Sequence, residues 1–180
     1  FMARFKMHPF ISTMANMLII FGLVTYATKG VSFGAIDPAI PNIFIPKAGR
    51  FPMIILWAII AVVVVWFIWN KTTFGKNLYA VGGNPEAATV SGISVFKVTM
   101  GAFIMAGILY GFGSWLECLR MVGSGSAAYG QGWDMDAIAA CVVGGVSFTG
   151  GIGKISGVVT GVLIFTSLTY SLTILGIDTN

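Results

Sequence analysis

Long apolar runs alternate along the chain with short connections that are polar or rich in glycine and proline. A helix of about 20 apolar residues crosses a bilayer core about 30 Å thick. The pattern predicts four such spans, over residues 10–28, 53–69, 98–116 and 155–177. The run 53–69 shows none of the alternating polarity that a transmembrane barrel strand needs. We therefore expect membrane helices.

A fifth apolar run, residues 137–148, is interrupted by a glycine-rich stretch before the last span begins. Twelve helical residues rise about 18 Å, which is short for a crossing. Together with the last span it is typical of a broken helix, which membranes tolerate where protein or a water-filled cavity surrounds it. Whether this run crosses the bilayer stays open.

The connections differ in character. Residues 29–50 hold Pro38, Pro41 and Pro46, a spacing that we expect to prevent any helix there. We therefore predict an irregular loop outside the membrane.

Composition agrees with the pattern. Hydrophobic residues make up 57% of the chain and charged residues 9%, with a mean hydropathy of +0.91, whereas a soluble domain carries about 25% charged residues. The fold class expected is all-α, a polytopic transmembrane bundle forming a single membrane domain over residues 1–180. Because the chain starts at Phe1 and ends without a terminal signal, we expect an excerpt of a longer protein.

The net charge of +4 comes from basic residues that are dispersed singly. Nucleic-acid binding needs a basic patch or stripe, so we do not expect nucleic acid as a partner. Basic residues concentrate in cytoplasmic loops of membrane proteins. If residues 137–148 cross, one side holds Arg4, Lys6, Lys71, Lys76, Lys97 and Lys154, and the other holds Lys29, Lys47, Arg50 and Arg120. This imbalance places the connection 70–97 in the cytoplasm.

Within that connection, both ends of a short helix are marked. Asn84 is a preferred N-cap, Pro85 fits the first helical position, Glu86 complements the positive helix end, and Gly92 supplies a left-handed stop. Such a helix cannot be stable alone in water, so it needs a partner surface. It either lies against its own bundle or docks into a neighbouring protein and transmits its movement. In the second case, Ala87 would permit close approach, as would Ala88.

Three stretches carry a resemblance to a known family: residues 9–14, residues 73–93 and residues 136–151. They resemble sugar ABC transporter permeases of the ribose and galactose group, and together they place nearly the whole chain on the family pattern. The stretches Thr13-Met14 and Val146-Ser147-Phe148 depart from the pattern that we expect, which leaves the exact sugar open.

The resemblance implies a longer subunit, of which an N-terminal portion and a final span are missing here. It implies import of a galactose-like or methyl-galactoside-like monosaccharide across the bacterial inner membrane. The implied partners are an ABC ATPase subunit, a periplasmic sugar-binding protein and a second permease copy in a homodimer. The ATPase would couple through Asn84, Pro85, Glu86, Ala87, Ala88, Gly92 and Ile93.

The chain offers no enzymatic chemistry that we can identify. Gly153-Lys154 is followed by Ile155 and preceded by Phe148 where a phosphate loop needs glycine, so we expect a borrowed ATPase. We predict no catalytic residues, no metal and no cofactor, and we expect Asp136 to cap a helix beginning at Ala137. The alternative is an ion-coupled secondary transporter or a channel, which would need ionisable groups inside the membrane.

Two further sets of residues are candidates. Glycines repeat on helix faces, where membrane helices pack closely, and either static packing or sliding between two transport states would explain them. The packing or gating glycines are Gly107, Gly111, Gly144, Gly145, Gly150, Gly151, Gly153, Gly157 and Gly161. A possible substrate path consists of Tyr129, Gln131, Trp133 and Asp134, aromatic and hydrogen-bonding groups that suit a sugar, although loop residues packing on each other explain them equally well.

Overall fold

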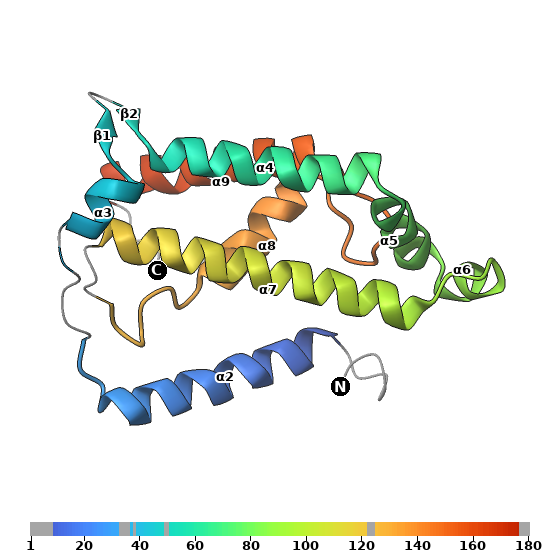
Figure 1. The fold of residues 1–180 in the computed structure, drawn as a ribbon, viewed down its shortest axis with the longest axis horizontal. Coiled ribbons are helices and arrows are strands. Elements are labelled where there is room, and N and C mark those ends of the chain that lie inside the picture. Colours follow the sequence, from blue (N-terminus) through green and yellow to red (C-terminus); the bar gives the residue numbers. More distant parts are fainter. Residues whose placement is uncertain (1–8, 33–36, 38, 49–50, 122–124, 177–180) are drawn as a thin grey trace. The chain divides into compact units, whose positions relative to one another are not determined.

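The computed structural model describes residues 9–32, 37, 39–48, 51–121 and 125–176. The chain divides into two compact units, the first of residues 1–61 and 99–129, the second of residues 62–98 and 130–180. Figure 1 shows the elements α2 (Pro9–Thr28), α3 (Ala39–Phe44), β1 (Lys47–Ala48), β2 (Phe51–Pro52), α4 (Ile54–Lys71), α5 (Thr73–Gly83), α6 (Pro85–Val90), α7 (Val95–Arg120), α8 (Trp133–Val143) and α9 (Ile155–Ile174). The all-α polytopic class is confirmed, while the single membrane domain stays a prediction.

Four of the described helices are long and apolar enough to cross a membrane, and they coincide with the four predicted spans: α2, α4, α7 and α9. With 18 residues, α4 rises about 27 Å, and with 26 residues, α7 rises about 39 Å. The helix α7 continues past both of its predicted ends and includes Lys97 and Glu117. Long charged side chains at helix ends can reach water while the backbone stays helical.

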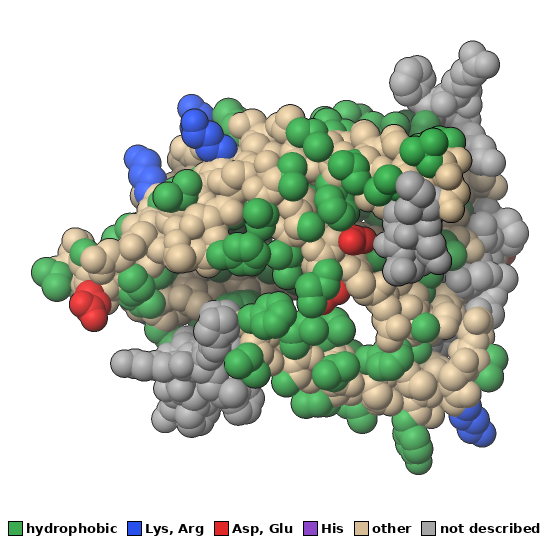
Figure 2. Space-filling model, turned by 180° about the vertical axis from the view of Figure 1, so that it is seen from behind, with side chains coloured by type: hydrophobic (Ala, Val, Ile, Leu, Met, Phe, Trp, Pro, Cys, Tyr) green, Lys and Arg blue, Asp and Glu red, His purple; other side chains and the backbone are tan. Residues whose placement is uncertain are grey.

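Apolar side chains of these helices point outward rather than into a common core. Large hydrophobic residues are exposed along α2, α4, α7 and α9, and Figure 2 shows hydrophobic side chains over much of the visible face, with few charged groups among them. A surface of this kind is costly in water and stable in lipid or against other protein segments. The surface therefore fits the membrane location that the composition predicts.

The prediction that residues 29–50 contain no helix is wrong. The short helix α3 runs from Ala39 to Phe44 and includes Pro41. Asp37 starts it, because the Asp37 Oδ1 accepts a hydrogen bond of 2.9 Å from the Ala39 backbone N–H. Pro41 is tolerated because it lies in the first turn, where a backbone N–H has no helical partner. Pro38 lies outside the described residues.

An aromatic cluster holds α3 within the first unit. The Phe44 ring meets the Trp115 ring edge to face at 5.0 Å between centroids, and Trp57 meets Phe112 at 5.9 Å. The Trp57 indole N–H also donates a 3.0 Å hydrogen bond to the Phe44 carbonyl oxygen. The cluster fixes one end of the loop against α4 and α7, and the short pair β1 and β2 continues the chain into α4.

The connection 70–97 contains a helix that the sequence did not reveal. The helix α5 begins after Thr72, whose hydroxyl accepts a 3.4 Å hydrogen bond from the Gly75 N–H. Three glycines in α5 argue against a helix, since each costs about 1 kcal/mol relative to alanine. Gly75 is required by packing, because a Cβ there would lie 1.9 Å from the Trp69 carbonyl oxygen.

The predicted short helix is confirmed as α6, with the predicted signals at both ends. The Asn84 Oδ1 accepts a 3.0 Å hydrogen bond from the Ala87 N–H, and Pro85 occupies the first turn. At the other end, Gly92 has a φ of +81°, and the Ile93 N–H donates to the Ala88 carbonyl oxygen at 3.0 Å. This pattern is a Schellman motif, so both ends of a six-residue helix are satisfied.

The broken-helix pair is present as α8 and α9, which pack on each other in the second unit. The prediction that Asp136 caps a helix from Ala137 is wrong, because α8 starts at Trp133. Its N-cap is Gly132, with a φ of +88° and no side-chain hydrogen bond to the helix end. Asp136 lies in the first turn, as Asp134 does, where a negative charge complements the positive end of the helix dipole.

Glycines allow the backbones of α8 and α9 to touch. A Cβ added at Gly144 would lie 2.4 Å from the Gly157 carbonyl oxygen, and one at Gly161 would lie 2.2 Å from the Ala140 carbonyl oxygen. Gly161 and Ala140 are both buried. In lipid, where burial of apolar side chains gives little advantage, such close approach is what holds helices together.

Replacing Gly161 by Ala should therefore destabilise the protein by about 1–3 kcal/mol, since the added methyl meets backbone that cannot move aside. The measurement is thermal unfolding of the full-length permease in detergent. Gly113→Ala in α7 is the control, because its Cβ would meet no atom of the described residues within 4 Å. Equal unfolding temperatures for the two variants would contradict the packing role of Gly161.

Candidate functional site

The helix α6 presents most of its side chains to solvent. Val90, at its last turn, is 90% exposed, and Glu86 and Ala87 are exposed too. Ala88 is 4% exposed and faces its own chain. Of the two alanines proposed for close approach, Ala87 is therefore the one that a partner could reach. Figure 1 shows α6 as a short helix beyond the end of α5.

Behind α6, the helix α5 contacts the segment that joins α8 to α9. The Tyr79 hydroxyl donates a 2.7 Å hydrogen bond to the Gly153 carbonyl oxygen. A Cβ added at Gly82 would lie 2.6 Å from the Gly151 nitrogen, and one at Gly150 would lie 2.8 Å from the Gly82 carbonyl oxygen. We call these five residues the glycine junction.

A cavity of about 640 Å³ lies beside the junction within the second unit. Polar side chains and glycine backbone line it: Asn70, Tyr79, Gly144, Gly145, Gly151, Ile152, Gly153, Lys154, Ser156, Gly157 and Thr160. These groups can hydrogen-bond water or a hydroxyl-rich solute. The described residues that line it include no carboxylate, histidine or thiol, and its ionisable side chains are those of Tyr79 and Lys154.

Six of the nine predicted glycines lie in two backbone contacts of the second unit. The structure brings Gly144, Gly157 and Gly161 together at the α8 and α9 contact, and it places Gly150, Gly151 and Gly153 in the junction. Gly145 has a φ of +80° just after α8 and lines the cavity. At Gly107 and Gly111 of α7, an added Cβ would meet nothing within 4 Å among the described residues. Their packing role stays a prediction.

The predicted substrate path is not assembled around the cavity, which none of its four residues lines. Gln131 is exposed in the turn before α8, and Trp133 and Asp134 lie in the first turn of that helix. Tyr129 belongs to the other unit. The role of these four residues in substrate passage stays a prediction.

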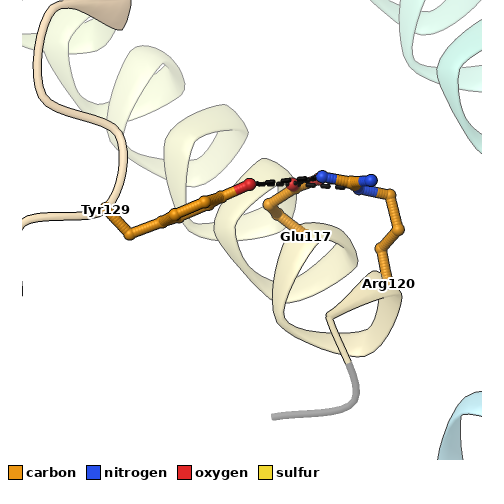
Figure 3. Close-up of polar contacts among 3 residues, drawn as sticks. All are labelled: Glu117, Arg120 and Tyr129. Carbon is orange, nitrogen blue, oxygen red and sulfur yellow. Dashed lines mark hydrogen bonds and ion pairs between the residues drawn. The ribbon is translucent and has the colours of Figure 1, made fainter. Parts of the chain in front are cut away.

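Tyr129 takes part in a polar cluster at the end of α7. Its hydroxyl donates a 2.6 Å hydrogen bond to the Glu117 carboxylate and accepts one of 3.2 Å from the Arg120 guanidinium. Arg120 also forms an ion pair with Glu117 one turn earlier, and Figure 3 shows the three side chains meeting. The hydrogen bond to Glu117 raises the pKa of Tyr129 above its ordinary value of 10.0. The cluster ties the loop after α7 to the helix end.

Sequence reasoning missed Tyr79 and the cavity. Tyr79 is half-buried on α5, a helix that was not predicted, and its partner Gly153 follows it by 74 residues. No local pattern could have paired them. The glycine-rich run around Gly150 was the available signal, because closely spaced glycines mark places where another backbone approaches.

Comparison with known proteins identifies the family. Residues 1–179 match the family described as "Branched-chain amino acid transport system / permease component". The chain is similar to the galactose/methyl galactoside import permease protein MglC of Treponema pallidum, with 56% identity over 192 residues, which cover 100% of this chain and 35% of that protein. No solved structure matches.

Two further relatives extend the comparison. MglC of Escherichia coli is 44% identical over 183 residues, covering 98% of this chain and 54% of that protein. The ribose import permease protein RbsC of Bacillus subtilis is 35% identical over 178 residues, covering 96% of this chain and 54% of that protein. The chain thus spans about half, or less, of the length of these relatives.

The relatives are named as transport permeases, and the four membrane-length helices agree with that class. The resemblance to the ribose and galactose group is confirmed. The chain is a multi-pass protein of the bacterial inner membrane, and it belongs to the permease-component family that its residues 1–179 match.

Proposed function

We propose that the chain forms part of the permease subunit of an ABC importer that carries a galactose-like or methyl-galactoside-like monosaccharide. A separate ATPase subunit drives it through α6. The observation that carries this proposal is α6 itself, a helix capped at both ends whose apolar Val90 is 90% exposed. The permease moves a solute and performs no catalysis of its own.

The names of the relatives support the substrate class. The MglC proteins of Treponema pallidum and Escherichia coli are named for galactose and methyl galactoside, whereas RbsC is named for ribose at lower identity. Because the identity is higher to the MglC proteins, we assign the galactose-like class. An importer of this kind also works with a periplasmic sugar-binding protein and a second permease copy.

The shape of α6 suits a docking element. A helix that is already formed loses little conformational entropy when it binds, so more of the contact energy appears as affinity. Val90 provides an apolar anchor, and Glu86 at the opposite end provides one negative charge. The side chain of Ala88 packs inward, so a load on α6 is passed to its own chain.

The energy source is the first test of this function. In membrane vesicles containing the full-length permease with its ATPase and binding protein, uptake of radiolabelled D-galactose should stop when ATP is depleted. It should continue when an uncoupler collapses the ion gradient. The opposite result would favour an ion-coupled secondary transporter.

The docking surface is the second test. Val90→Asp removes an apolar contact whose burial is worth about 1.5–3 kcal/mol, so the ATPase subunit should bind about 10- to 100-fold more weakly. Glu86→Lys should weaken binding in the same direction. The measurement is the amount of ATPase that copurifies with the permease from detergent-solubilised membranes.

Val31→Asp is the matched control, since Val31 is an exposed valine that lies just beyond the end of α2. From the distribution of basic residues we expect the connection that contains Val31 to lie outside the cytoplasm. The control should retain the ATPase and insert normally. Equal recovery of ATPase with Val90→Asp and Val31→Asp would rule out α6 as the docking element.

A further inference from the structure

Asn84 joins α5 to α6 directly, as the C-cap of the first helix and the N-cap of the second. Its backbone N–H donates a 3.1 Å hydrogen bond to the Ala80 carbonyl oxygen and ends α5, while its side chain accepts from the Ala87 N–H and begins α6. One residue therefore serves both helices, and no flexible linker separates them. A displacement of α6 is therefore expected to move α5 as well.

The next contact along this path is the glycine junction, defined above as Tyr79, Gly82, Gly150, Gly151 and Gly153. Its members come from segments far apart in sequence, and Gly82, Gly150 and Gly151 approach one another through backbone atoms. A contact between backbones has no side chains that can change rotamer and absorb a shift. The Tyr79 hydroxyl adds a directional bond to the Gly153 carbonyl oxygen. Movement of α5 therefore displaces the segment that it contacts.

That segment is itself closed and joined to α9. The Ser147 N–H donates a 3.0 Å hydrogen bond to the Ile152 carbonyl oxygen, which closes the turn between α8 and α9. Gly153 precedes Lys154, the N-cap residue of α9. Three residues into α9, Gly157 contacts Gly144 of α8. The start of α9 is thus held between α8 and the junction.

We propose that the glycine junction transmits the displacement of α6 to the start of α9, with Tyr79 as a positioning residue that keeps the two segments in register. This inference rests on the proposed function, in which an ATPase moves α6. It adds that the coupling runs through α5 into the broken-helix pair, beside the cavity that Tyr79 and Gly153 line.

The test uses the full-length permease, reconstituted with its ATPase and binding protein, and measures D-galactose molecules transported per ATP hydrolysed. Tyr79→Phe removes one hydrogen bond and keeps the ring, so this ratio should fall about 2- to 10-fold while ATP hydrolysis continues. Gly82→Ala should lower the ratio further, because its methyl would meet the Gly151 backbone nitrogen at 2.6 Å.

Gly83→Ala is the matched control. This neighbouring glycine of α5 has no atom within 4 Å of an added Cβ in the part of the chain that the structure describes. It should keep the ratio of the unmodified permease. Thermal unfolding of each variant is measured alongside. A merely structural role for Tyr79 predicts that uptake and ATP hydrolysis fall together, with a lower unfolding temperature.

Two results would overturn the inference alone: an unchanged ratio in both Tyr79→Phe and Gly82→Ala, or a proportional fall of uptake and hydrolysis with lost thermal stability. Failure of the proposed function is a separate result. It would appear as absence of ATP-dependent uptake in the unmodified permease, and the inference would then fall with it.

Discussion

Direct contact between glycine backbones is the interaction on which the second unit depends. Helices in lipid gain little from burying apolar side chains, so they associate through close approach. The pair α8 and α9 follows this rule at Gly144, Gly157 and Gly161. With 11 residues, α8 rises about 17 Å and cannot cross alone. Its position is maintained by the neighbour that it touches, and the turn that follows satisfies part of its own backbone.

Contact between glycine backbones also links the pair α8 and α9 to the end of the second unit that carries α5 and α6. Gly82 of α5 meets Gly150 and Gly151 much as Gly144 meets Gly157. Beyond it, α6 stays helical with six residues because Asn84 caps one end and the Gly92 motif closes the other. Hydrogen bonds at its two ends therefore help to stabilise α6, although it is shorter than the helices that are stable alone in water. A partner therefore meets a helix that is already formed.

Sequence predicts the parts of this fold whose causes are local. The four spans follow from apolar length, and α6 follows from its caps. The analysis of the sequence missed α5 and α3, because both contain residues that ordinarily break helices. Gly75 is required by contact with Trp69, and Pro41 is harmless in a first turn begun by Asp37. Among the candidate site residues, Tyr79 was missed because its partner lies far along the chain.

The glycine junction and the neighbouring cavity have a common physical origin. A residue without a side chain lets backbones meet, and it leaves space on the side where no backbone arrives. Gly144, Gly151 and Gly157 each combine a backbone contact with a place in the cavity wall. Packed side chains interlock and resist sliding, whereas a glycine contact resists compression without interlocking. Pressing α5 against the turn between α8 and α9 therefore meets backbone atoms directly. A sideways shift of α9 breaks few side-chain contacts at the glycine junction.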